Sequence, residues 1–475
     1  MVHPPNGGTV QGPPPAQAPP PASPVRAPAP PAHAPVPPAR RGVWTGSRDR
    51  LRAAATTEPG RLWIMGTLVA ALVVAFGAVT AFEISDRADS ADDVVSRSQP
   101  LSADAANIYR SLADADTAAA SGFLAGSVEP ADVHARYDSD IATASRLLVK
   151  AASHTDSSTE SGRQIAQLNE QLPRYTGLVE RARANNRQGL PLGGAYLRYA
   201  NQQMSTALLP AAEKLYDAET GRLYDDYDSA TLWPYLGTAV GILALGGLCY
   251  VQRRNYLRTN RVFNHGLLAA SAASVAVLLW LVAGHLVASA DLHTSRTHGQ
   301  ESLKVLNDAR ISSLKARSNE NLTLVSRGSV LTKDGKHDQY ESDYATDMAA
   351  LVSGLDKAKS LAAGDSAGSG PVDAARADVT TWKHRHAAAR RTDDSGDYED
   401  ALTQVIGRTN STGQSFDQVD KALDQALGHE QREFTRAASD GRGALTGLPV
   451  GAAVLAVLGA AAAGLGISRR LSEYR

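Results

Sequence analysis

Two apolar stretches that flank a short basic segment decide the fold, LWPYLGTAVGILALGGLCYV at 232–251 and GLLAASAASVAVLLWLVAGHLVASA at 266–290. Neither stretch contains Asp, Glu, Lys or Arg, and each is long enough to cross a bilayer. Because lipid offers no partners for backbone polar groups, each should be a membrane-spanning helix. The segment between them, residues 252–265, has no acidic residue and four arginines: Arg253, Arg254, Arg258 and Arg261. Short arginine-rich segments stay on the inner side of a membrane, so this segment predicts a cytoplasmic loop.

Two further uncharged stretches, residues 62–82 and 444–467, complete a set of four predicted spans. A cleaved signal peptide is the weaker interpretation of residues 62–82, because about sixty residues precede them. A cytoplasmic central loop then places both end segments, residues 1–61 and 468–475, in the cytoplasm. We therefore expect a multi-pass protein of the cell membrane, with too few residues after the last span for a folded output domain.

The segments between the spans differ in charge from the predicted inner parts of the chain. Residues 83–231 carry 14 basic and 22 acidic side chains, residues 291–441 carry 19 and 24, and residues 1–61 carry 7 and 2. An acidic outer side and a basic inner side are typical of a membrane protein and give no support to nucleic-acid binding. The single cysteine, Cys249, excludes an intramolecular disulfide and a cysteine-based metal site.

The outer segment at 83–231 has apolar residues at three- and four-residue spacing, which predicts helices throughout. Three breaks, at 126–130, 154–158 and 189–194, divide it into four helices, the first of them kinked near Pro100. We expect an extracytoplasmic four-helix bundle.

The second outer segment, residues 291–443, predicts a second four-helix bundle that arose by internal duplication. YDSDIAT at 137–143 and YESDYAT at 340–346 share five of seven residues. Repeats of this length are best interpreted before any single motif. The predicted fold class is therefore all-α, with four membrane helices and two outer four-helix bundles.

The N-terminal leader, residues 1–61, differs from the rest of the chain in its proline-rich composition. It holds 15 of the 24 prolines within its first 41 residues, and little in it is large enough to bury. This composition predicts a disordered tail or spacer, with docking of its proline-rich tract into a partner as the alternative.

The repeated motif supplies two candidate pairs for binding a ligand or partner, Tyr137 with Asp140 and Tyr340 with Asp343. Residues three apart share one face of a helix, where each pair could hold an amine or the basic group of a partner. The alternative is a helix start, in which Ser and Asp cap the N-terminus and Tyr staples the first turn. The apolar residues that follow each motif favour the helix start.

The second and fourth spans share small residues four apart, Gly237 with Gly241 and Gly447 with Gly451. Such spacing lets helix backbones approach closely. We interpret it as packing within a four-helix membrane bundle, with formation of a homodimer as the alternative.

The sequence contains no motif for catalysis or for a cofactor. It lacks H-E-x-x-H, G-x-S-x-G and a phosphate-binding glycine loop, so we predict neither an enzyme nor a cofactor. The histidines of KHRH at 383–386 point to different faces of a helix, which favours a solvated basic face over a metal site. His285 is the only ionisable side chain within the spans, apart from Cys249 and the tyrosines, and we interpret it as interfacial rather than as a proton relay.

Two spans that flank an outer four-helix bundle resemble the sensory half of methyl-accepting chemotaxis receptors and sensor kinases. With that half present twice, the layout of residues 62–467 is similar to the GlnX-like family of four-span actinobacterial membrane signalling proteins. The resemblance rests on layout, length and composition. It implies coupling of an extracytoplasmic amino-acid-binding lipoprotein to a cytosolic protein kinase. The basic inner residues are the candidate contacts: Arg253, Arg254, Arg258, Arg261, Arg469 and Arg470.

The expected function is a non-catalytic signalling adaptor that detects a ligand-loaded binding protein or, as an alternative, a small molecule directly. A shift of the returning helices would pass through the spans to the inner face. This mechanism requires outer helices that are continuous with the spans, and no Gly/Ser-rich hinge stands at 82–83 or 228–232. A passive scaffold of the cell envelope is the competing function.

Overall fold

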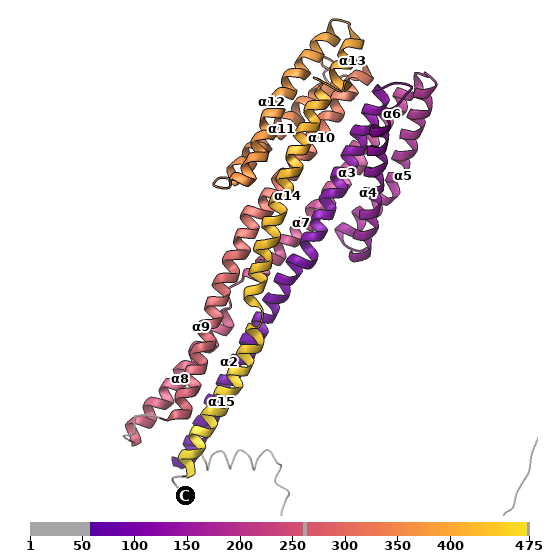
Figure 1. Ribbon diagram of the computed structural model, residues 1–475. Coiled ribbons are helices and arrows are strands. Elements are labelled where there is room, and N and C mark those ends of the chain that lie inside the picture. Colours follow the sequence, from indigo (N-terminus) through magenta and orange to yellow (C-terminus); the bar gives the residue numbers. More distant parts are fainter. Residues whose placement is uncertain (1–57, 260–263, 473–475) are drawn as a thin grey trace, which may run out of the picture. The chain divides into compact units, whose positions relative to one another are not determined.

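The computed structural model describes residues 58–259 and 264–472, and every regular element within these ranges is a helix (Figure 1). The all-α prediction is confirmed. The predicted disordered leader lies outside the described residues up to residue 57, and so does Arg261 in the predicted inner loop.

Within the described ranges, four helices are long and apolar enough to span a membrane: α2 (Glu58–Asp93), α8 (Tyr235–Thr259), α9 (His265–Thr294) and α15 (Leu448–Ser472). α2 packs against α8 and α15, and α9 packs against the same two helices. The predicted inner loop at 252–265 is wrong in its first half, because α8 continues to Thr259.

The two outgoing helices leave the spans without a break. α2 continues through a π-helical turn, η1 (Val94–Ser98), into α3 (Gln99–Leu124). α9 continues through η3 (Ser295–Gln300) into α10 (Glu301–Ser326). The π-turn ends two residues before Pro100, near which the sequence predicts a kink.

The two returning helices are broken where they meet the spans. α6 (Leu192–Gln203), η2 (Met204–Leu208) and α7 (Leu209–Thr231) form one run, but residues 232–234 separate it from α8. α14 (Thr412–Leu445) is separated from α15 by Thr446 and Gly447. The predicted continuity of these helices is therefore wrong. Pro234 cannot donate a backbone hydrogen bond, and Gly447 has a φ of +83° that ends a helix.

Each outer segment folds into a bundle. The first bundle consists of α3, α4 (Ala131–His154), α5 (Glu160–Arg187) and the α6–η2–α7 run. The second consists of α10, α11 (Gln339–Leu361), α12 (Ser366–Asp394), the short α13 (Tyr398–Ile406) and α14. Most apolar residues at helical spacing are buried, whereas Leu178, Val325 and Leu427 are partly buried. The buried ones include Ile108, Leu112, Leu168, Tyr175, Leu314, Leu322, Val419, Leu423 and Phe434.

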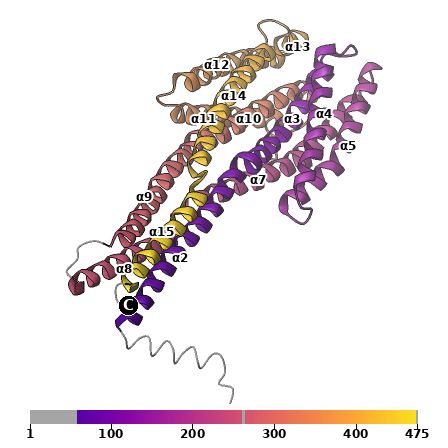
Figure 2. The ribbon, with the colours of Figure 1, turned by 60° about the horizontal axis from the view of Figure 1, so that its bottom comes forward.

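The two bundles are joined along α3 and α10, which lie side by side in both views (Figures 1 and 2). A single cluster of buried apolar residues extends through both bundles. Thr117 on α3 donates a hydrogen bond of 3.0 Å to the backbone oxygen of Leu314 on α10. The two bundles therefore share one core, and the residues along the α3–α10 junction belong to both.

Candidate functional site

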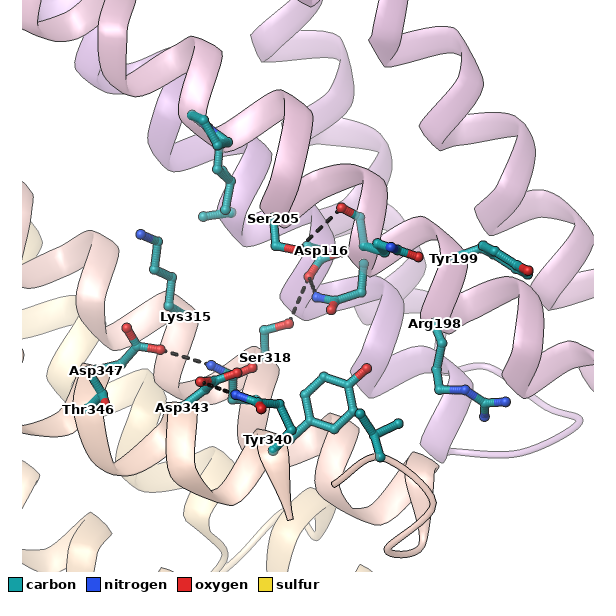
Figure 3. A pocket seen from close by; sticks show the side chains of 18 of the residues that line it. Asp116, Arg198, Tyr199, Ser205, Lys315, Ser318, Tyr340, Asp343, Thr346 and Asp347 are labelled. Carbon is teal, nitrogen blue, oxygen red and sulfur yellow. Dashed lines mark hydrogen bonds between the residues drawn. The ribbon is translucent and has the colours of Figure 1, made fainter. Parts of the chain in front are cut away.

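A cavity of about 860 Å³ lies between the two bundles, and we call it the inter-bundle cavity. Its walls come from α3, α6, η2 and α7 on one side and from α10 and α11 on the other (Figure 3). The charged and aromatic residues that line it are Tyr109, Asp116, Arg198, Tyr199, Glu213, Lys315, Tyr340, Asp343 and Asp347. Smaller cavities lie at the far end of the first bundle and beside α10 and α11.

Asp116 on α3 lies deepest among these charged groups. Its carboxylate accepts hydrogen bonds from Tyr175 at 3.2 Å, Asn201 at 2.8 Å and Ser318 at 2.8 Å. Burial raises the pKa of Asp116, and the three hydrogen bonds act in the opposite direction. Because its partners lie on α5, α6 and α10, Asp116 ties both bundles together at the cavity.

The α11 wall carries two further carboxylates. Asp343 accepts a hydrogen bond of 2.8 Å from Gln339, and Asp347 accepts one of 2.9 Å from Asn319. Burial raises the pKa of both groups, that of Asp347 to about 6. Both carboxylates are therefore held by neutral amides.

Two cations line the cavity with these carboxylates, Arg198 on the opposite wall and Lys315 on the same wall. Neither Arg198 on α6 nor Lys315 on α10 has a carboxylate within ion-pairing distance among the described residues. The ammonium group of Lys315 lies 5.6 Å from the centre of the Tyr109 ring. Burial lowers the pKa of Lys315, but Tyr109 and nearby carboxylates outweigh burial and leave it raised. The cavity thus holds charges of both signs, and neither Arg198 nor Lys315 forms a direct ion pair there.

The repeated motif contributes to the cavity only through its second copy. Tyr340 and Asp343 line the cavity, as labelled in Figure 3. Tyr137 is instead buried inside the first bundle, where the Arg183 guanidinium lies 4.1 Å from the centre of its ring. The Asp140 carboxyl faces Asp114, and burial together with Asp114 raises its pKa to about 8. The first pair therefore lies outside the inter-bundle cavity.

The alternative interpretation of the motif as a helix start is wrong for its first copy. α4 begins at Ala131, so Tyr137 lies in its second turn. In the second copy the cap is Asp338, which accepts hydrogen bonds from the backbone N–H groups of Tyr340 and Glu341. The motif itself lies within the helix in both bundles.

A different polar junction between the bundles is closed by ion pairs. Arg136 on α4 pairs with Asp114 at 2.8 Å and reaches Asp417 on α14 at 3.5 Å. Arg310 on α10 pairs with Asp420 at 2.7 Å and Asp424 at 2.8 Å. Arg136 and Arg310 therefore have carboxylate partners, whereas Arg110 beside them donates a hydrogen bond to Asn107.

The interpretation of KHRH at 383–386 as a solvated basic face is wrong for His386. This side chain is 5% exposed, bonds to Glu320 at 2.8 Å and Glu341 at 3.1 Å, and stacks on Tyr344. Burial lowers its pKa, but the two carboxylates outweigh burial and raise it to about 9. The described residues contain no group of three His, Cys, Asp or Glu side chains suited to a metal ion.

Three of the four span glycines make close contacts within the chain. A Cβ atom at Gly241 would lie 2.6 Å from the Phe76 ring on α2, and one at Gly237 would lie 2.8 Å from Glu83. A Cβ atom at Gly451 would collide with Trp280 on α9. The packing role predicted for Gly447 is wrong, because this residue forms the break between α14 and α15 and no atom lies within 4 Å of its Cβ position.

The basic inner residues are only partly described. Arg253 is exposed and Arg254 is half-buried near the end of α8. Arg469 lies near the end of α15, whereas the side chains of Arg258 and Arg470 lie outside the described residues. Their role as contacts for a cytosolic partner stays a prediction.

Sequence reasoning missed a polar clamp at the outer end of the first span. Arg87 donates hydrogen bonds to the backbone oxygens of Leu232 at 2.6 Å and Trp233 at 3.0 Å. Glu83 accepts a hydrogen bond of 2.6 Å from the backbone N–H of Gly237, in the first turn of α8. The signal for this clamp in the sequence is the Glu83–Arg87 spacing of four residues directly after a span.

The match to a known family falls on the first bundle. Residues 90–228 match the model of the actinobacterial sensor domain. The matched sensor domain extends from the end of α2 to the end of α7, and it contains Asp116 and Arg198 of the inter-bundle cavity. Together with four helices apolar enough to span a membrane, this supports a sensor membrane protein. No curated protein and no solved structure matches the chain.

The sensor-domain match does not extend to the second bundle, so the predicted internal duplication stays a prediction.

Proposed function

We propose that this protein is a non-catalytic membrane sensor that relays an extracytoplasmic signal to a cytosolic partner, such as a serine/threonine kinase. The sensor-domain match and the four candidate spans support the sensing role. The basic inner ends of α8 and α15 supply the surface for the cytosolic partner. Both chain ends lie in the cytoplasm in this proposal, in agreement with the positive-inside rule.

One observation carries the proposal: the two helices that meet at the cavity are the two that continue into the spans. α3 contributes Asp116 to the cavity, and α10 contributes Lys315 and Ser318. Each runs into its span through a π-turn without a break. A packed helix moves as a stiff element, so a change in the spacing of α3 and α10 would reach the inner side.

This route differs from the one expected from the sequence, which used the returning helices. Those helices are broken at 232–234 and 446–447. The clamp of Glu83 and Arg87 fixes the first of these breaks to α2. A displacement of α2 would therefore carry the outer end of α8 with it.

The test is a charge reversal at the inner face. The full chain carries Arg253→Glu, Arg254→Glu, Arg258→Glu and Arg261→Glu together, and cytosolic partners are identified by crosslinking in intact cells. A relay should lose its cytosolic partners while it still reaches the membrane. The matched control reverses Arg163 and Arg174, two exposed arginines of α5.

Because the inner arginines also set topology, the side of the membrane reached by α4 and α5 is measured in the same cells. Equal recovery of cytosolic proteins from the variant and the control, with unchanged topology, would contradict the relay. If the unchanged protein also crosslinks only to envelope proteins, this would support the competing function of a passive scaffold.

A further inference from the structure

We infer that the inter-bundle cavity binds a small zwitterion, a molecule that carries one carboxylate and one ammonium group, such as a free amino acid. The inference rests on the proposed sensing function and names the ligand class of the same site. Arg198 is assigned to the carboxylate of the ligand, and Asp343 to its ammonium group.

The cations of the cavity have no carboxylate partner within the described part of the protein. Arg198 and Lys315 line a cavity that also holds Asp116, Asp343 and Asp347, yet neither cation is paired with a carboxylate in the described chain. Amide and hydroxyl groups hold Asp116, Asp343 and Asp347 instead, whereas Glu213 lies near Lys315 without a direct ion pair. Partly buried charges are costly unless they are paired, so groups of both signs remain available to a ligand.

The neighbouring junction shows how this fold arranges charges that serve structure alone. There Arg136 and Arg310 each bind two aspartates, with distances between 2.7 and 3.5 Å. Arg136 and Arg310 thus pair directly with carboxylates of the same two bundles, whereas Arg198 and Lys315 in the cavity do not.

Ligands with one sign of charge fit this arrangement poorly. A dicarboxylate would satisfy Arg198 and Lys315 but would also face the carboxylates of α11. A polyamine would satisfy those carboxylates but would face both cations. A zwitterion gains charge-assisted hydrogen bonds at both ends, and these are stronger than bonds between neutral groups.

The dimensions and lining of the cavity agree with a small organic ligand. Its volume of about 860 Å³ falls within the range of typical ligand sites, about 300–1,000 Å³. The rings of Tyr109, Tyr199 and Tyr340 offer apolar surface for a side chain. Ser205 reaches the cavity from η2, and π-helical turns occur frequently at functional sites.

The position of the two assigned residues connects binding to sensing. Arg198 lies on the first bundle and Asp343 on the second (Figure 3). A zwitterion held at both ends would draw α6 and α11 together. The spacing of α3 and α10 would then change, and these two helices continue into the spans.

The test measures binding to the purified full chain in lipid nanodiscs. The twenty standard amino acids are screened at millimolar concentration by thermal unfolding, and hits are measured by calorimetry. The amino acid that binds most tightly is then compared with two analogues. One is the amine that lacks its carboxylate, and the other is the acid that lacks its ammonium group. We expect each analogue to bind at least about tenfold more weakly, because each loses one charge-assisted contact.

Two variants assign the ends of the ligand. Arg198→Gln should weaken binding of the amino acid about tenfold and abolish the preference for the amino acid over its amine. Asp343→Asn should abolish the preference for the amino acid over the acid that lacks its ammonium group. The matched controls are Arg181→Gln and Asp225→Asn, which change exposed residues outside the cavity and should leave binding unchanged.

Three results would overturn the inference: no binding of any amino acid at millimolar concentration, equal binding of either analogue, or unchanged binding by both cavity variants. Failure of the proposed function has a different signature. In that case an amino acid binds the cavity, but its addition to cells leaves the crosslinked cytosolic proteins unchanged.

Discussion

The guanidinium group of Arg87 on α2 lies 2.6 Å from the backbone oxygen of Leu232, where the returning chain breaks between α7 and α8. Arg87 is 8% exposed, and it also binds the backbone oxygen of Trp233. Carbonyl groups at the end of a helix need partners when they are withdrawn from water. An outgoing helix therefore supplies the cap of a returning helix, and the break becomes a fixed joint.

We predict that Arg87→Met destabilises the protein. The substitution keeps an apolar stem but leaves two carbonyl groups without their donor, which should cost about 2 kcal/mol of unfolding free energy. The measurement is the unfolding of the full chain in nanodiscs. The control is Arg97→Met, an exposed arginine of η1. If both variants lose the same unfolding free energy, Arg87 does not act as a cap.

His386 should make stability depend on pH. Its folded pKa of about 9 lies above the usual value of about 6.5, so protonation favours the folded state. The stabilisation is complete below the unfolded pKa and is lost as the pH rises through about 9. His386→Gln should lower the unfolding free energy by about 2 kcal/mol at pH 6 and by less at alkaline pH.

Unfolding of the full chain between pH 6 and pH 10 measures this effect. His384→Gln changes an exposed histidine of the same helix and serves as the control. If His386→Gln lowers the unfolding free energy equally at pH 6 and pH 10, His386 is not charged in the folded protein.

A third prediction concerns the packing of the spans. Gly241→Ala places a methyl group 2.6 Å from the Phe76 ring, which is 1% exposed and has little room to move. Such overpacking costs about 1–3 kcal/mol. Gly246→Ala, on the same helix but with open space at its Cβ position, should be neutral or slightly stabilising. Thermal unfolding in nanodiscs compares the two, and equal midpoints would refute this packing.

The membrane topology is tested by thiol labelling in a Cys249→Ser background. Ser157→Cys and Asp334→Cys, in exposed loops of the first and second bundles, should react with an impermeant maleimide in intact cells. Asn260→Cys, in the predicted inner loop, should react only after permeabilisation. If only one of Ser157→Cys and Asp334→Cys reacts in intact cells, four spans with both bundles outside the cell are excluded.

Local patterns in the sequence were sufficient for the helices and their buried faces. Leu112, Leu168 and Leu423 are buried as their spacing predicts, because the side of a helix that a residue occupies depends only on positions a few residues away. The breaks of the returning helices were harder to predict. Pro234 lies near the end of an apolar stretch, where a proline is compatible with either a kink or a complete break.

The amino-acid sequence alone determined the helical class, the four apolar spans and the core face of each helix, because hydropathy and helical period are local properties. Only the tertiary structure decided that Asp116, Arg198, Lys315 and Asp343 line one cavity, and that His386 is buried against Glu320. These residues come from different helices, and each looks like an ordinary solvated charge in its own segment. Which helix faces meet depends on how two bundles pack along α3 and α10, and no single segment encodes that choice.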